Sequence, residues 1–159
     1  MKMLSAEVID FLHTQSFVLV STIDKYGFPH NSCKDIVKID PSGQVYLLDV
    51  YHGLTSENIK HNHQVSISAV DEHKFLGYCL KGKARIMSDE GISHDIIKSW
   101  EDKITSRLVK RLLRNMQEEK GHGHHPEASL PRPKYLIVVE IEEIINLVPY
   151  SLRKESAHG

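Results

Sequence analysis

The sequence predicts a mainly β fold, a small closed barrel, with a long helical segment before the last strand. Short runs rich in β-branched residues recur along the first half of the chain, with turn signals between them, which is typical of a barrel. From Gly91 to Lys120 the apolar spacing becomes helical. The 159 residues suit one domain with a real core. We expect a single domain over residues 1–150 and a frayed tail over 151–159.

Composition narrows the classes of partner. The chain is 40% apolar and 26% charged with a net charge of −1, which does not indicate a surface for nucleic acid or for an anionic membrane. No apolar run is long enough for a signal peptide or a bilayer span. Two cysteines fall far short of a disulfide framework. We therefore expect a cytoplasmic protein with neither a nucleic-acid nor a membrane partner.

The first elements have recognisable start signals. Ser5 can cap a helix that runs to about Thr14. The run Phe17–Ile23 is almost continuously apolar, as expected of a strand covered on both sides. After a turn that ends at Gly27, Pro29 should open the next strand, His30–Asp40, at a position where its missing N–H matters least.

The middle of the chain should alternate strand and helix. A turn with Pro and Gly in favourable positions precedes a third strand, Gln44–Val50. One or two helical turns are expected over Ser56–Asn62. The fourth strand, Gln64–Val70, alternates apolar and polar residues, so one of its faces should be buried.

The fifth predicted strand, Phe75–Met87, is interrupted by Gly77 and Gly82. Glycines inside a strand often mark a bulge, a barrel corner or the close approach of another group. The last strand should cover Tyr135–Ile141, which is apolar and β-branched, and continue irregularly over Glu142–Val148.

The long helical segment has an unusual apolar spacing. Its stripe repeats every four residues, at Ile92, Ile96, Trp100, Ile104, Leu108, Leu112 and Met116. Because a helical turn holds about 3.6 residues, this spacing drifts around a straight helix. We expect either a bend or break near Lys103–Ser106 or a helix held between two surfaces. The loop that follows, His122–Pro133, has no periodicity.

The strongest candidate site is the segment between the third and fourth strands. Gly53 precedes Thr55 and Ser56 at the start of the predicted helical turns. The first N–H groups of a helix point outward and attract anions, and nearby hydroxyls add donors, so a phosphate group suits this position. The second predicted strand brings Lys34 within plausible reach. A simple helix cap is the alternative, since caps outnumber phosphate sites.

Several motifs in order carry a resemblance to a known family. The matching segments are Phe17–Ile23, Gly27-Phe28-Pro29-His30, Val45-Tyr46-Leu47, Leu54 to Asn62, Gln64–Ala69 and the glycine-bearing run Gly77 to Ile86. Together they resemble the split-barrel flavin-binding proteins of the pyridoxamine-phosphate-oxidase-like family. The resemblance covers about residues 5–87 and 135–148. It implies a six-stranded, Greek-key-like split β-barrel and a homodimer with FMN at the subunit interface.

The resemblance also implies a set of cofactor-binding residues. Three lie on the second strand, two at the end of the third strand, and two in the phosphate-binding turn. They are Ser32, Cys33 and Lys34, Asp49 and Val50, and Thr55 and Ser56, respectively. Leu54 departs from the family pattern, because many members carry Lys or Arg there; Lys34 or Lys60 is available to replace that charge.

The resemblance implies an FMN-dependent oxidoreductase or a flavin electron-transfer protein that acts on an unknown small substrate or redox partner. The flavin would carry the redox chemistry, and the sequence identifies no catalytic residue. The alternative is a non-enzymatic protein on the same fold, or one that binds or degrades haem. Some similar proteins bind haem through a histidine near the C-terminal part.

A histidine tract offers a further ligand. The chain holds eleven histidines, and three of them, His122, His124 and His125, fall in one loop. Imidazole groups suit Zn, Ni or Cu, so this loop is a candidate metal site. No cysteine pair at metal-binding spacing accompanies it, which favours a solvated loop instead.

Overall fold

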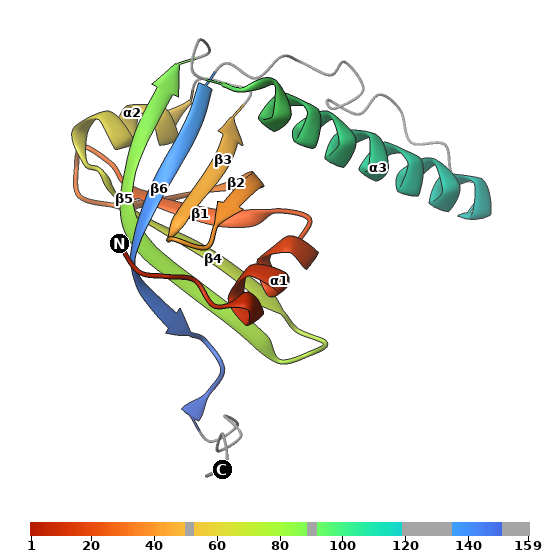
Figure 1. Ribbon diagram of the computed structural model, residues 1–159, viewed down its shortest axis with the longest axis horizontal. Coiled ribbons are helices and arrows are strands. Elements are labelled where there is room, and N and C mark those ends of the chain that lie inside the picture. Colours follow the sequence, from red (N-terminus) through yellow and green to blue (C-terminus); the bar gives the residue numbers. More distant parts are fainter. Residues whose placement is uncertain (50–52, 89–91, 119–134, 151–159) are drawn as a thin grey trace.

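In the part of the chain that the structure describes, the protein is an antiparallel β-barrel with three helices (Figure 1). The computed structural model describes residues 1–49, 53–88, 92–118 and 135–150. The elements are α1 (Ala6–Thr14), β1 (Val18–Ile23), β2 (Pro29–Asp40), β3 (Gln44–Asp49), α2 (Leu54–His61), β4 (Gln64–Asp71), β5 (Leu76–Ser88), α3 (His94–Glu118) and β6 (Tyr135–Asn146). The predicted class of fold, a six-stranded barrel with a long helix before the last strand, is confirmed.

Pairing between strands that are distant in the sequence closes the barrel. The strand order is β1-β2-β3-β6-β5-β4, and β1 also pairs with β4, so that each of the six described strands has a neighbour on both sides. β6 lies between β3 and β5, with Asp49 opposite Tyr135 and Ala84 opposite Val139. The last strand therefore completes a sheet whose other members all precede the long helix in the chain.

The interior of the barrel is the main hydrophobic core. Residues of one face of each strand point inward, including Val20, Val45, Leu47, Ile67 and Ile137, all of which are fully inaccessible to solvent. The alternation of inward and outward side chains follows from the period of two along a strand. This alternation decides which of the predicted site residues share a face.

A second core forms between the outer surface of the barrel and α3. Trp100 and Ile104 are buried against Leu48, Leu136 and Val138 of the neighbouring strands. The helix also bonds to the backbone of β2 where the β2–β3 register shifts. There Ser99 Oγ donates to the carbonyl of Val37 at 3.2 Å, and Lys103 Nζ donates to that of Ile36.

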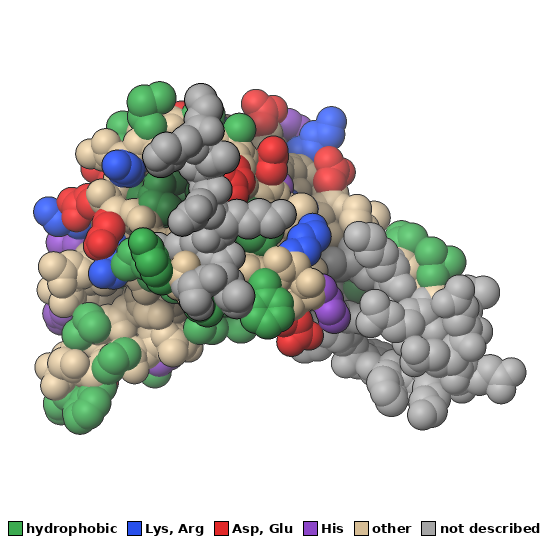
Figure 2. Space-filling view, turned by 90° about the horizontal axis from the view of Figure 1, so that it is seen from below, with side chains coloured by type: hydrophobic (Ala, Val, Ile, Leu, Met, Phe, Trp, Pro, Cys, Tyr) green, Lys and Arg blue, Asp and Glu red, His purple; other side chains and the backbone are tan. Residues whose placement is uncertain are grey.

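The expected bend or break near Lys103–Ser106 is absent, because α3 is one helix of 25 residues. The stripe residues Trp100 and Ile104 are buried against the barrel, and Ile96 and Leu108 pack partly buried beside them. The end of α3 extends beyond the barrel (Figure 1), and Val109 and Leu113 in the second half of the helix are 49% and 57% exposed. Seen from below, apolar side chains lie open there, at the right of Figure 2. None of the described helices is both long and apolar enough to cross a membrane.

The interruption expected at Gly82 is confirmed. The register of β5 against β6 shifts between Lys81 and Gly82. A Cβ atom at Gly82 would lie 2.0 Å from the carbonyl oxygen of Glu140, so only glycine allows the two strands to approach this closely.

α1 packs into the barrel core through Val8, Phe11 and Leu12, and Tyr78 of β5 adds a polar contact. Ser5 caps the helix by accepting from the N–H of Val8, as predicted. Phe11 packs edge-on against Tyr78 of β5, with ring centroids 5.3 Å apart, and the Tyr78 hydroxyl donates to Glu7 at 2.8 Å. Burial, together with the hydrogen bond to Glu7 and its charge, raises the pKa of Tyr78 to about 12.

Replacing Tyr78 with Phe should lower the free energy of unfolding at neutral pH by about 1 kcal/mol, because the hydrogen bond to Glu7 is lost. The pKa of Tyr78 is higher in the folded state than the ordinary value of 10.0. Its contribution is therefore complete below pH 10 and is lost as the pH rises toward 12.

Urea unfolding of wild type and Tyr78→Phe across this range should show the difference between them shrinking. Tyr26→Phe, at an exposed tyrosine, is the matched control and should not change stability. A difference that stayed constant from neutral pH to pH 12 would contradict the assigned role of the hydroxyl.

Candidate functional site

The backbone N–H groups at the start of α2 are not capped by a side chain of the N-cap residue. Gly53 is the N-cap residue and supplies no capping side chain. Its carbonyl accepts from the N–H groups of Ser56 and Glu57 and from Ser56 Oγ at 2.9 Å. The first N–H groups of a helix have no partner within the helix, and its dipole is positive at this end. This start can therefore receive an anion.

Two side-chain hydrogen bonds hold α2 against the barrel. Ser32 Oγ of β2 lies 2.8 Å from Thr55 Oγ1, and Asn58 Nδ2 donates to Thr22 Oγ1 of β1 at 2.9 Å. Thr22, Thr55 and Asn58 are buried. The bonds join residues that are far apart in the sequence, so they fix how the helix start lies relative to β1 and β2.

A charged row crosses three adjacent strands beside this helix. Lys34 Nζ of β2 lies 2.6 Å from Asp49 Oδ2 of β3, and the Tyr135 hydroxyl of β6 donates to the same oxygen. The side chains of Lys34 and Asp49 are only 12% and 6% exposed. A pair this buried interacts more strongly than a surface pair, and each partner compensates for the lost hydration of the other.

Tyr135 is protonated at neutral pH and acts as a donor. Burial raises the pKa of Tyr135 far above the usual tyrosine range, and the hydrogen bond to Asp49 and its negative charge raise it further. An interaction with Ser56 of α2 opposes this rise. The interaction links the charged row to the start of the helix.

The site offers the hydrogen-bond donors that a phosphate group needs. It offers less positive charge than a phosphate site usually has. The hydroxyls of Ser32 and Thr55 and the N-terminus of α2 converge. The positive charge of Lys34, however, is balanced by Asp49. Leu54, which stands where many family members have a basic residue, is 58% exposed and adds none. A phosphate bound here would rely on hydroxyl and backbone donors more than on net charge.

The structure brings most of the predicted site residues together. Ser32, Lys34, Asp49, Thr55 and Ser56 lie at the junction of β2, β3 and α2. The predicted residue Val50 lies outside the described residues.

Cys33 is the exception among the described residues. It pairs with the exposed Leu19, whereas Ser32 pairs with Val20 and Lys34 with Val18, both of which are buried. Its exposed thiol therefore points to the opposite face of β2, away from the hydroxyl cluster. Consecutive strand residues alternate between faces, so Ser32, Cys33 and Lys34 do not line one surface together.

Sequence reasoning missed Thr22, Asn58 and Tyr135. Asn58 lies within the segment Leu54 to Asn62, which carried the family resemblance, so that resemblance could have identified it. Tyr135 offers a weaker signal, because it is a tyrosine at the start of an otherwise apolar strand. The hydroxyl of a buried tyrosine usually has a hydrogen-bond partner, so its burial could have suggested one. Nothing near Thr22 in the sequence indicates its bond to α2.

The histidine tract His122, His124 and His125 lies outside the described residues. Among the residues that the structure describes, no group of three or more His, Cys, Asp or Glu side chains is arranged to hold a metal ion.

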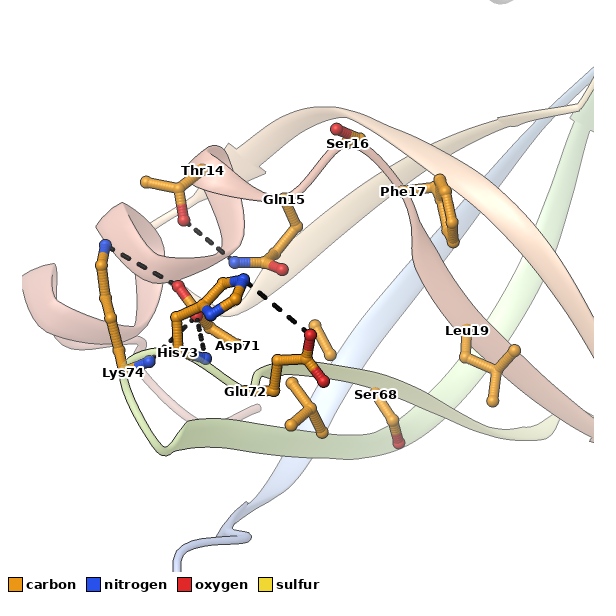
Figure 3. A pocket seen from close by; sticks show the side chains of 12 residues that line it. Thr14, Gln15, Ser16, Phe17, Leu19, Ser68, Asp71, Glu72, His73 and Lys74 are labelled. Carbon is orange, nitrogen blue, oxygen red and sulfur yellow. Dashed lines mark hydrogen bonds and ion pairs between the residues drawn. The ribbon is translucent and has the colours of Figure 1, made fainter.

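A separate groove of about 780 Å³ lies at the other ends of β1 and β4 (Figure 3). The end of α1, the start of β1 and the β4–β5 turn form its walls. The polar side chains of the groove bond to one another, as Lys74 does to Asp71 and Gln15 to Thr14. None of the predicted site residues lines it.

Comparison with known proteins identifies the family of this chain. A family model described as pyridoxamine 5'-phosphate oxidase matches residues 4–147. The chain belongs to the pyridoxamine 5'-phosphate oxidase family. Among curated proteins, no match to this chain was found.

Solved structures share the fold of this family member. HupZ from Group A Streptococcus is 24% identical with a TM-score of 0.64, and the match covers 92% of this chain and 95% of HupZ. A protein related to general stress protein 26, of the pyridoxinephosphate oxidase family, from Clostridium acetobutylicum is 16% identical, with a TM-score of 0.56 and coverages of 89% and 92%. HutZ from Vibrio cholerae, described as a heme storage protein, is 16% identical, with a TM-score of 0.53 and coverages of 91% and 94%. At these identities the likeness concerns the fold.

Replacing Lys34 with Met should lower the free energy of unfolding by about 3 kcal/mol, because it leaves the buried Asp49 carboxylate without its cation. Replacing the whole row, as Lys34→Met with Asp49→Leu and Tyr135→Phe, should cost less than Lys34→Met alone, since no charge is then left buried.

Urea unfolding of both variants measures this order, with Lys60→Met at an exposed lysine of α2 as the control. If Lys34→Met is no more destabilising than Lys60→Met, the pair does not contribute in the way the geometry indicates.

Proposed function

We propose that this protein binds FMN, with the phosphate at the start of α2, and that it works as a flavin-dependent oxidoreductase or electron-transfer protein. The observation that carries the proposal is the pair of hydroxyls, Ser32 Oγ and Thr55 Oγ1, 2.8 Å apart at a helix N-terminus whose cap residue is glycine. Membership of the family supports the choice of a flavin.

The hydroxyls are suited to a phosphate because each can donate to an oxyanion. In the structure they bond to each other, so neither is left unsatisfied. A phosphate would take both as donors together with the free N–H groups of the first turn of α2. Asp49 weakens the pull of Lys34 on that phosphate, so the affinity should depend on the hydroxyls more than on this lysine.

When bound, the flavin supplies the redox chemistry. The chain's own contribution is to bind and orient it, and we assign no catalytic side chain. The substrate or redox partner is a small molecule or protein that the site does not specify. The proposal includes a homodimer with the cofactor at the subunit interface, and a cytoplasmic location, where the free thiols of Cys33 and Cys79 would stay reduced.

Haem is the alternative ligand, because HutZ, which shares the fold, is described as a heme storage protein. The two ligands are distinguished by the absorption spectrum of the protein as isolated. A yellow protein with flavin bands that a reductant bleaches supports the proposal. A Soret band would instead indicate that the protein binds haem. Sedimentation of the same sample tests for the dimer.

Thr55→Val and Ser32→Ala should each weaken FMN binding about tenfold, because each removes one hydrogen bond to a charged group. Riboflavin, which has no phosphate, should bind to these variants as it does to wild type. Flavin fluorescence titration measures both affinities.

Thr105→Val, at an exposed threonine of α3, is the control and should bind both flavins normally. Equal weakening of FMN and riboflavin would place the hydroxyls away from the phosphate, and no weakening of either would remove them from the site.

A further inference from the structure

A second groove, of about 590 Å³, lies between the β4–β5 turn and the end of the described chain. Its apolar walls come from two segments. Val70, Phe75 and Leu76 belong to the β4–β5 hairpin, and Leu147 to Pro149 follow β6, which runs out below the barrel in Figure 1. None of the residues of the proposed phosphate site lines this groove, so it is a separate feature of the surface.

The apolar side chains of the groove are open to solvent. Val70 and Phe75 are 64% and 68% exposed, and Leu147 is 42% exposed. Among the described residues other than glycine, only Phe75 has a positive φ, of 53°. A bulky residue rarely adopts this left-handed backbone, because its Cβ atom is crowded there. The turn thus presents an aromatic ring at the groove at a conformational cost, which a contact that buries the ring would offset.

The rim of the groove carries an exposed negative charge. Asp71 accepts from the N–H groups of His73 and Lys74 and lies 3.8 Å from the Lys74 ammonium, so its charge is engaged within the turn. The side chain of Glu72 is 86% exposed, and its contact with His73 at 3.8 Å is an ion pair only when that histidine is protonated. Figure 3 shows both contacts. A cation on a segment that enters the groove can therefore pair with Glu72.

The segment that follows the groove wall in the sequence has matching chemistry. The described chain ends at Tyr150, one residue after Pro149 of the wall, and residues 151–159 have the sequence Ser-Leu-Arg-Lys-Glu-Ser-Ala-His-Gly. Leu152 is the large apolar residue of this segment, and Arg153 and Lys154 come directly after it. Because an extended chain spans about 3.3 Å per residue, Leu152 can lie no farther than about 10 Å from Pro149.

Attachment to the groove wall favours this segment over a free partner. A short linker gives the segment an effective concentration in the millimolar range, so even a weak contact is populated within one chain. Burial of a leucine side chain favours such a contact by about tenfold or more. An apolar side chain followed by two cations therefore suits an apolar groove that has a carboxylate at its rim.

We propose that residues 151–159 dock in this groove within the same chain, with Leu152 between Phe75 and Leu147 and the two cations beside Glu72. The contact covers the exposed ring of Phe75 and ties the β4–β5 turn to the end of β6. The groove is then an intramolecular docking surface, and its occupation does not depend on the ligand of the phosphate site.

Two backbone amides on the same side of the molecule's last strand report on this contact. The N–H of Leu147 donates to the carbonyl of Gly77 at 2.8 Å, beside the groove. The N–H of Ile141 donates to the carbonyl of Gly43, also at 2.8 Å, away from the groove. In the full chain, Leu152→Ser should make the Leu147 amide exchange its hydrogen about tenfold faster and leave the Ile141 amide unchanged. Hydrogen exchange followed by NMR measures both rates.

Further variants separate the apolar contact from the charge. Leu152→Met keeps an apolar side chain and should exchange as wild type does, and a chain that ends at Tyr150 should behave as Leu152→Ser does. Leu113→Ser, at an exposed leucine of α3, is the matched control and should leave the Leu147 amide unchanged. Glu72→Lys should speed exchange of this amide, and added salt should reduce that effect, because it screens exposed charges.

Three results would overturn the proposal. If Leu152→Ser leaves exchange of the Leu147 amide unchanged, the segment does not cover the groove. If the Ile141 amide accelerates as much as the Leu147 amide, the substitution acts on the whole fold and not on the groove. If protection of the Leu147 amide in wild type rises with protein concentration, a second copy fills the groove, and docking within one chain is wrong.

Discussion

The pairing of buried polar groups between α2 and the barrel is the constraint on which the site depends. Ser32 with Thr55, and Thr22 with Asn58, are hydrogen-bonded pairs in which three of the four residues are buried. Leaving any of these groups unpaired would cost more than the pairing contributes, so the helix has one favourable position on β1 and β2. That position turns the N-terminus of α2 toward the inward face of β2, where the hydroxyls, Lys34 and His30 lie.

The charges of the site are balanced within the protein. Asp49 accepts from both Lys34 and Tyr135, so the buried row carries a cation, an anion and a neutral hydroxyl. Such a row is tolerated because every member has a partner, and it keeps Lys34 in one place. The proposed phosphate site beside it therefore has rigid geometry and little net charge, which favours recognition by hydrogen-bond donors over general attraction of anions.

One buried polar atom, Nδ1 of His30, contrasts with these satisfied pairs. The described part of the chain pairs its buried side-chain polar atoms except at Nδ1 of this histidine. The exception lies on β2, the strand that also carries Ser32 of the hydroxyl pair. The exposed apolar residues of α3, in contrast, lie in the second half of that helix.

The sequence by itself determined the strands, the long helix and the candidate phosphate segment, because turn residues and apolar periodicity are local properties. The family pattern around Thr55 pointed to the same place. Tertiary structure alone decided that Cys33 faces away from Ser32 and Lys34, that Tyr135 reaches Asp49 and that Asn58 bonds to Thr22. These depend on strand register and on contacts between residues far apart in the chain, about which local patterns carry no information. The continuous course of α3 was decided in the same way, because its packing on the barrel through Trp100 and Ile104 is a tertiary contact.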